Sequence, residues 1–325
     1  MPNVLVTFSA NEQLRKAVLS SLEGIGNVVF LSDISAKDRP ATLTSAEILL
    51  AWDVEGELEP SEFGMISGVK LLQLLSAGVD HVPFRQIPST IFIASNAGAY
   101  AEPMAEHVLA MILAIFKNLS DRHNKLANGI FDHVNENRML QGSTCAILGF
   151  GGIGRATARL LRCFGVRILA INSSGRTDEP AEFIGTLKDL EYVLRLADVA
   201  VVALPLTNTT RGLIGKLELG WMKNDATIVN VARGDIINEA ALYEKLKLHP
   251  GFHAAIDTWW VEPFRDGNFH TSFPFLELPN VLGSPHNSGL VPNSLMTGVV
   301  HATENVKRFL NHEPVSGVVK RSDYV

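Results

Sequence analysis

The chain has 325 residues, of which 46% are apolar and 19% charged, and its 28 Lys and Arg and 34 Asp and Glu residues give a net charge of −6. This composition is typical of a folded globular protein and excludes a largely disordered one. A chain of this length usually divides into two domains, because a single hydrophobic core stops growing at a smaller size. The basic residues are scattered, without a run that could follow a phosphate backbone, which argues against a nucleic-acid partner.

The sequence also argues against a membrane partner. The longest nearly unbroken apolar stretch, residues 108–116, is about half the ~20 residues that span a bilayer. No basic segment leads into an apolar run at the N-terminus, so we expect a cytoplasmic protein. Cys145 and Cys163 are the only cysteines and cannot form a disulfide framework or a zinc site, and we expect both to pack in the core.

Strand-like and helix-like segments alternate in two series that join near residue 97. The first series predicts a helix over 12–22 and strands over 4–8, 28–31, 48–51, 71–75 and 91–94. The second predicts a long helix over 101–128 and strands over 145–148, 166–171, 199–204, 227–231, 253–256 and 281–283. Such alternation is typical of parallel sheets covered by helices on both faces. A last helix, over 294–310, leaves no room for a new domain after it, so we expect it to return to the first series.

A glycine-rich turn opens the second series of strands. The segment Gly149-Phe150-Gly151-Gly152-Ile153-Gly154 matches G-x-G-x-x-G, and it lies between a strand-like run and a helix-like run that ends at Gly165. In such a turn Gly149 permits the sharp bend, Gly151 lets the backbone approach a pyrophosphate, and Gly154 lets the helix pack closely on the strand. The N–H groups of the first helical turn bind phosphate. The motif therefore predicts a dinucleotide site.

The residues after the strand at 166–171 indicate which dinucleotide is bound. A carboxylate about 20 residues beyond the motif usually binds the adenosine ribose. This chain has Asn172 there, followed by Ser173, Ser174, Gly175 and Arg176. Neutral donors and a cation suit a 2′-phosphate, which a carboxylate would repel. The sequence therefore favours NADP, with NAD as the alternative if Arg176 is only a solvated loop residue.

Three polar side chains follow late strands, at the ends where open α/β sheets bind ligands. Arg233 stands in Asn230-Val231-Ala232-Arg233-Gly234, Glu262 in Asp257-Thr258-Trp259-Trp260-Val261-Glu262-Pro263, and His286 follows Pro285. In this order, and after the glycine-rich turn, the motifs resemble the D-isomer-specific 2-hydroxyacid dehydrogenase family over essentially the whole chain. The resemblance implies an α/β fold with two doubly wound parallel sheets. A Rossmann cofactor domain, 98–290, would be inserted in a flavodoxin-like substrate domain, 1–97 with 291–325.

The resemblance also implies catalytic roles. Arg233 would bind the substrate carboxylate, His286 would be the general acid and base, and Glu262 would be its partner. The chemistry agrees, because a guanidinium pairs with a carboxylate through two hydrogen bonds and histidine exchanges protons near neutral pH. Each residue also has an ordinary interpretation. Arg233 could bridge sheet carbonyls, Glu262 could cap a helix before Pro263, and His286 could be a buried core histidine.

Other binding residues follow from the same resemblance. Asp257 would lie near the nicotinamide carboxamide, and the backbone N–H groups of Ala77 and Gly78 would receive the substrate carboxylate. Trp52 and Tyr100 are candidate pocket walls. The remaining cofactor contacts would be Gly152, Ile153, Leu204, Pro205, Val231 and Ala232. Trp259 and Trp260 stand where the family often has a smaller or single aromatic residue, which leaves the pocket size open.

The implied reaction is the NAD(P)-dependent reduction of a 2-keto acid to a D-2-hydroxy acid, or its reverse. Glyoxylate and hydroxypyruvate are the leading substrates, and bulkier keto acids stay open. No metal is implied, because the H-x-x-x-H pair of His249 and His253 has no acidic residue between its histidines. Formate and phosphite dehydrogenases are also similar, but the formate branch places Gln where this chain has Pro285. Dinucleotide-sensing corepressors are similar too, and usually add long disordered tails. Similar enzymes are homodimers, and here 101–128 would form the contact.

Overall fold

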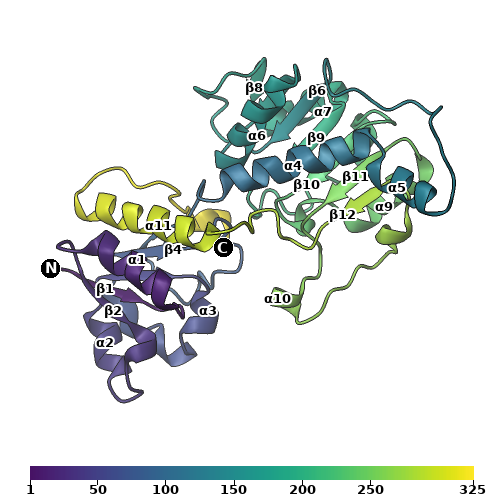
Figure 1. The fold of residues 1–325 in the computed structure, drawn as a ribbon. Coiled ribbons are helices and arrows are strands. Elements are labelled where there is room, and N and C mark those ends of the chain that lie inside the picture. The colour runs from purple at the N-terminus through teal and green to yellow at the C-terminus, as the bar shows by residue number, and fades with distance from the viewer. The chain divides into compact units, whose positions relative to one another are not determined.

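The computed structural model describes the whole chain, Met1–Val325, which divides into two compact units (Figure 1). The first unit contains Met1–Tyr100 and Val291–Val325, and the second contains Ala101–Leu290. The sequence places the first boundary at residue 97 instead of 100. Each unit is built on its own parallel sheet with helices packed on it. The predicted fold class, α/β with two doubly wound parallel sheets, is confirmed.

The sheet of the first unit has five strands in the order β2-β1-β3-β4-β5, all paired in parallel. This is the order of a flavodoxin-like sheet. Its strands are β1 (Asn3–Val6), β2 (Asn27–Phe30), β3 (Ile48–Ala51), β4 (Leu71–Leu74) and β5 (Phe92–Ala94). Its helices are α1 (Glu12–Leu22), α2 (Arg39–Ser45), α3 (Val54–Glu57) and α11 (Ser294–Leu310).

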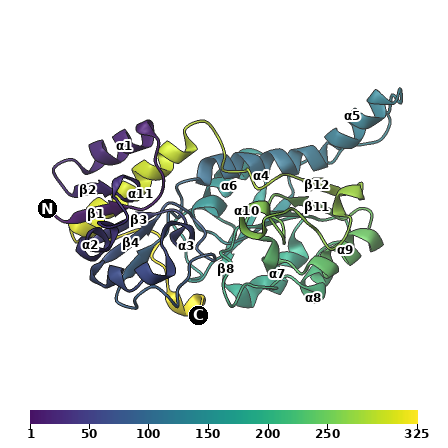
Figure 2. The same cartoon turned by 90° about the horizontal axis from the view of Figure 1, so that it is seen from below.

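Apolar helix faces cover both sides of this sheet. Val18 of α1 and Val306 of α11 are buried on one side, where Figure 2 shows the two helices together, and Leu43 of α2 is buried on the other. Because both faces are covered, strands such as Ile48–Ala51 are continuous apolar runs. The expected return of the last helix is confirmed, since α11 packs against α1 and β4.

Buried Asn96 fastens α11 to the segment that follows β4. Its amide group donates to the carbonyl oxygens of Leu75 at 3.2 Å and Gly298 at 2.9 Å, and its oxygen lies 2.7 Å from Nδ1 of His301. These bonds satisfy an amide that has no solvent contact. They also hold Leu75, directly before the loop 76–80, against α11.

The sheet of the second unit has seven parallel strands in the order β12-β11-β10-β9-β6-β7-β8. Counted from β6, this is the Rossmann order 3-2-1-4-5-6 with β12 added at the edge. The strands are β6 (Thr144–Leu148), β7 (Arg167–Ile171), β8 (Phe183–Gly185), β9 (Val199–Val202), β10 (Thr227–Asn230), β11 (His253–Ile256) and β12 (Val281–Gly283). The sequence misses β8, because a strand of three residues gives no periodic signal.

Helices cover both faces of the second sheet as well. Figure 2 shows α4 and α6 on one side, where they share a buried cluster, and α7 and α8 on the other, where they pack together with α9. The helices of this unit are α4 (Ala101–Phe116), α5 (Leu119–Ala127), α6 (Gly152–Cys163), α7 (Leu190–Leu196), α8 (Lys216–Trp221), α9 (Glu239–Leu248) and α10 (Pro263–Asp266). No helix in either unit has the length and apolar composition needed to cross a bilayer.

The single long helix expected over 101–128 is wrong. The segment forms two helices, α4 and α5, which are interrupted at Asn118. Asn118 has φ of 50°, in the left-handed region that ends a right-handed helix and that asparagine tolerates better than most residues. None of the residues of α5 is buried, so no packing in the core favours a continuous helix across Asn118.

The expectation that both cysteines pack in the core is half correct. Cys145 lies in β6 and is completely buried, and burial raises the pKa of its thiol. Cys163 is exposed, because it is the last residue of α6 and its side chain lies on the solvent side of that helix. Its apolar sequence neighbours therefore did not predict its surroundings.

Candidate active site

The glycine-rich turn joins β6 to α6 and excludes side chains at two positions. Gly149 has φ of +100°, and a Cβ there would lie 2.4 Å from the carbonyl oxygen of Ala203. A Cβ on Gly154 would lie 2.1 Å from the carbonyl oxygen of Gly149. Only glycine fits either place, so the turn brings α6 close to β6 and to the segment after β9.

The same turn leaves room for a ligand at its second glycine. A Cβ on Gly151 would meet no atom within 4 Å, so the backbone there faces open space. Gly151 is the N-cap of α6 and makes no side-chain cap, and the first turn of a helix has N–H groups without intrahelical partners. These groups and the helix dipole favour an anion. The turn therefore fits the pyrophosphate of a dinucleotide.

The loop after β7 is organised by the amide of Asn172. Its oxygen accepts the N–H groups of Ser174 at 3.1 Å and Gly175 at 2.7 Å, and its nitrogen donates to the carbonyl oxygen of Arg176 at 2.8 Å. Asparagine commonly closes a loop on itself in this way. The amide is thus used within the loop, and so is the hydroxyl of Ser174, which lies 3.2 Å from the amide oxygen of Asn172. Ser173, Ser174 and Arg176 are exposed.

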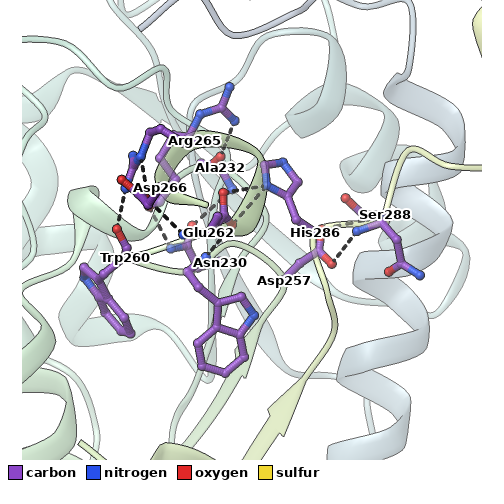
Figure 3. A network of polar contacts seen from close by, with 12 residues as sticks. Asn230, Ala232, Asp257, Trp260, Glu262, Arg265, Asp266, His286 and Ser288 are labelled. Carbon is purple, nitrogen blue, oxygen red and sulfur yellow. Dashed lines mark hydrogen bonds and ion pairs between the residues drawn. The ribbon is translucent and has the colours of Figure 1, made fainter. Parts of the chain in front are cut away.

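His286 and Glu262 form a hydrogen-bonded pair. Nδ1 of His286 lies 3.0 Å from each carboxylate oxygen of Glu262, as Figure 3 shows. Glu262 is only 4% exposed, and it also accepts the N–H of Trp259 at 2.7 Å. A carboxylate at Nδ1 places the proton there, which leaves Nε2 as the nitrogen that can exchange a proton with a substrate.

The pair excludes two ordinary interpretations of these residues. Glu262 is the N-cap residue of α10, yet its side chain makes no capping bond and turns to His286 instead. The His286 side chain is 24% exposed and therefore not a core histidine. The ring of Phe264 lies edge-on to the imidazole, with ring centres 5.2 Å apart.

Asp257 holds the turn on which His286 lies. Its carboxylate is completely buried and accepts the hydroxyl of Ser284 at 2.5 Å and the N–H groups of Asn287 at 3.1 Å and Ser288 at 3.2 Å. Burial opposes its ionisation, but the hydrogen bonds from Ser284, Ser288 and Asn287 lower its pKa below the ordinary value. His286 has φ of 51°, a left-handed conformation that such bonds must stabilise.

Arg233 follows β10 and is partly buried. Its Nη1 donates to the carbonyl oxygen of Ala232 at 2.7 Å. The side chain of Asn230 fixes the turn, because it accepts the N–H of Ala232 at 3.1 Å and donates to the carbonyl oxygen of Arg233 at 2.9 Å. A Cβ on Gly234 would lie 2.4 Å from the backbone of Trp259, so this turn touches the segment that follows β11.

The strand order therefore brings the three expected catalytic residues together. β10, β11 and β12 are neighbours in the sheet, and Arg233, Glu262 and His286 all follow the carboxyl ends of these parallel strands. Val231 and Ala232 lie in the same turn as Arg233 and are buried. All of these residues belong to the second unit.

The other expected cofactor residues of this unit lie near the glycine-rich turn. Leu204 and Pro205 follow β9, and the N atom of Leu204 would lie 2.7 Å from a Cβ on Gly149. Gly152 and Ile153 are the first residues of α6. The segment after β9 and the first turn of α6 therefore meet at Gly149.

The expected substrate residues of the first unit follow β3 and β4. Ala77 and Gly78 are half-buried in the loop after β4. Trp52 follows β3 and is 39% exposed, and its N–H donates to the carboxylate of Glu57 at 3.0 Å. Burial raises the pKa of Glu57, whose role in shaping this loop no sequence signal indicates. Tyr100 donates its hydroxyl proton to the carbonyl oxygen of Leu75 at 2.9 Å, within the same unit.

The paired tryptophans are packing residues of the second unit. Trp259 donates through its indole to the carbonyl oxygen of Ser284 at 2.9 Å, and Trp260 donates to that of Ile237 at 2.8 Å. A Cβ on Gly283 would lie 2.8 Å from the Trp259 ring. Both indoles are therefore held by the protein's own backbone. No signal in the sequence marks Ser284, although it stands two residues before His286. None marks His107 of α4 either, whose Nε2 lies 2.9 Å from the Ser284 hydroxyl oxygen.

Comparison with known proteins places the chain in a family. The family model for the D-isomer specific 2-hydroxyacid dehydrogenase, NAD binding domain, matches residues 109–288, more than half of the chain. The D-3-phosphoglycerate dehydrogenase of Methanocaldococcus jannaschii is 28% identical over 98% of this chain, which spans 59% of that relative's length. The glyoxylate reductase of Aeropyrum pernix is 30% identical over 71% of this chain and 70% of its own.

A solved structure agrees with these matches. A provisionally assigned formate dehydrogenase of Pyrobaculum aerophilum superposes with a TM-score of 0.82 at 27% identity, and the match covers 100% of both chains. The strand order, the glycine-rich turn and the family match agree, and the chain belongs to the D-isomer specific 2-hydroxyacid dehydrogenase family.

Proposed function

We propose that the protein reduces a small 2-keto acid to a D-2-hydroxy acid with a nicotinamide dinucleotide, or catalyses the reverse reaction. The observation that carries this proposal is the hydrogen-bonded pair of His286 and Glu262. These two residues follow β12 and β11, and Arg233 follows β10, the next strand in the sheet. An acid and base beside a carboxylate-binding cation suits a substrate that carries both a carboxylate and a reacting carbonyl.

Each residue of the trio has a chemical task in this proposal. Arg233 binds the substrate carboxylate through its guanidinium. Nε2 of His286 gives a proton to the carbonyl oxygen as it becomes a hydroxyl, and Glu262 stabilises the imidazolium. Asp257 orients the turn of His286, and the bound nicotinamide supplies or accepts the hydride. The N–H groups of Ala77 and Gly78, and the side chain of Trp52, are further proposed substrate contacts from the first unit.

Glyoxylate and hydroxypyruvate are the proposed substrates. Support comes from the relative named glyoxylate reductase, which matches 71% of this chain. Formate oxidation is the second candidate, because the structural relative from Pyrobaculum aerophilum is provisionally assigned to it. Formate releases no hydroxyl proton, however, so that reaction would leave the His286 and Glu262 pair without a task.

NADP is the proposed cofactor, with NAD as the alternative. The loop after β7 presents exposed Ser173, Ser174 and Arg176. Its first residue is Asn172, where folds that bind NAD usually have a carboxylate. A cation and hydroxyl groups complement a 2′-phosphate. The cytoplasmic location expected from the sequence stays a prediction.

A homodimer is the proposed assembly, with a second copy of this chain as the partner. Exposed apolar side chains are concentrated on α5 and the segment after it: Leu119, Leu126, Ile130, Phe131, Val134 and Met139. Grouped exposed apolar side chains mark an interaction surface. This segment follows directly on α4 and includes the second half of 101–128, the residues expected from the sequence to form the dimer contact.

Sedimentation equilibrium tests the assembly. The unmodified protein should have twice the mass of one chain, and the double variant Phe131→Ser/Val134→Ser should shift toward the monomer because both side chains, each 77% exposed in one chain, would lose an apolar partner. A matched control is Leu217→Ser, which changes an exposed apolar residue of α8. A monomer for the unmodified protein would contradict the proposal.

Replacing His286 with Ala tests the chemistry. The rate of keto-acid reduction should fall by about 10²–10⁴-fold because proton transfer is lost, while the dissociation constant of the dinucleotide should hardly change. Steady-state rates with glyoxylate, hydroxypyruvate and formate, and fluorescence titration of the reduced cofactor, measure both. His312→Asn, at an exposed position after α11, is the control. Near-normal keto-acid turnover in the His286 variant, or turnover of formate alone by the unmodified protein, would refute the mechanism.

Replacing Arg233 with Lys tests the carboxylate contact. A single ammonium cannot reproduce the two parallel hydrogen bonds of a guanidinium, so kcat/KM for the keto acid should fall by about tenfold or more. Arg211→Lys is the control, since Arg211 is exposed and pairs with Asp235. Full activity of the Arg233 variant would mean that the site needs only a positive charge.

Variants of the loop after β7 test the cofactor. Arg176→Ala should raise KM for NADPH by about ten- to hundredfold, the worth of a charge-assisted hydrogen bond, and leave KM for NADH nearly unchanged. Asn172→Asp keeps the oxygen that accepts from Ser174 and Gly175, and its charge should move selectivity toward NADH. Arg195→Ala on α7 is the control. An equal rise in KM for NADPH and NADH would show that Arg176 does not contact the 2′-phosphate.

A further inference from the structure

We infer that His107 is a positioning residue, which acts through Ser284 and Asp257 on the turn that carries His286. No motif marks His107, and the mechanism proposed above does not use it. The test of this role by kcat and KM rests on the proposed function. The test by NMR signals of His286 does not.

A chain of hydrogen bonds leads from His107 to Asp257. Nε2 of His107 lies 2.9 Å from the hydroxyl oxygen of Ser284, and that oxygen lies 2.5 Å from Oδ1 of Asp257. A serine hydroxyl has one proton. Because Asp257 is a carboxylate and can only accept, the hydroxyl donates to it and must accept from His107. The proton of the imidazole therefore lies on Nε2, which is also 3.7 Å from Oδ1 of Asp257.

The position of His107 in α4 shows that this contact is specific. The neighbouring residues Val108, Met111 and Ile112 are buried in the apolar cluster under the helix. His107 is the polar side chain that α4 directs to the ends of β11 and β12, and its side chain is 25% exposed. A polar group beside an apolar face costs free energy unless it is hydrogen-bonded. Ser284 supplies that bond.

These hydrogen bonds matter because they fix the orientation of the groups around the Asp257 carboxylate. A hydroxyl that must accept from His107 has its proton directed at Asp257, whereas a hydroxyl without that donor rotates among several directions. Asp257 in turn binds the N–H groups of Asn287 and Ser288 and holds the left-handed turn at His286. Loss of the His107 proton donor should therefore loosen the orientation of the imidazole at His286, and not the affinity for either substrate.

Two variants separate the hydrogen bond from the volume of the side chain. His107→Gln keeps an N–H donor at about the reach of Nε2, and His107→Leu removes it. The Leu variant should lower kcat by about tenfold, since small misplacements of a catalytic group are costly, with KM for keto acid and NADPH nearly unchanged. The Gln variant should retain most of kcat. Ser284→Ala should reproduce the Leu effect, and the double variant His107→Leu/Ser284→Ala should be no worse than either single one.

Ring ¹⁵N signals in the NMR spectrum of histidine-labelled protein give a readout that does not need turnover. The signals of His286, assigned with His286→Gln, should shift in His107→Leu and in Ser284→Ala and keep their positions in His107→Gln. His312→Asn, at an exposed position after α11, is the control and should move neither these signals nor kcat.

The outcomes distinguish this inference from the proposed function. If the unmodified protein reduces no keto acid but the His286 signals respond as stated, the proposed function fails and the positioning role stands. Equal losses of kcat in the Gln and Leu variants, or unchanged His286 signals in all of them, would overturn the positioning role. If His107→Leu does not fold, Ser284→Ala and His107→Gln decide the question by the same two measurements.

Discussion

The buried carboxylate of Asp257 receives a hydroxyl group and two backbone N–H groups from the segment that follows β12. A charge without solvent contact is tolerated only when its hydrogen bonds are complete. The segment must therefore keep one shape, and this shape includes the left-handed backbone of His286. The bonds that stabilise a buried charge also orient the proposed acid and base.

The parallel sheet explains why residues far apart in the chain meet at this place. Parallel strands end on the same edge, and β10, β11 and β12 are adjacent there. Arg233, Glu262 and His286 each follow one of these ends, where the backbone leaves the sheet and side chains can turn toward a common space. The glycine-rich turn after β6 opens at the same edge of the same sheet and faces open space at Gly151.

Local rules determined much of this in advance. Helices α1 and α11 and strands β3, β11 and β12 have the predicted bounds, because apolar periodicity and flanking polar residues are local signals. The glycine-rich turn was identified by spacing, since tight turns and close helix packing require glycine itself. The candidate trio came from motif order and a family resemblance, and the structure places all three residues at neighbouring strand ends.

Other features depend on partners that the sequence does not name. The amide of Asn172 closes its own loop, Asp257 binds the turn of His286, and His107 meets Ser284 across 177 positions of the chain. The helix break at Asn118 and the exposure of Cys163 likewise depend on what packs around each residue. The sequence alone determined the parallel α/β class, all strands but β8, the glycine-rich turn and the strand ends that bear the polar residues. Only the tertiary structure decided which hydrogen bonds these residues make, because a bond depends on where donor and acceptor meet in space.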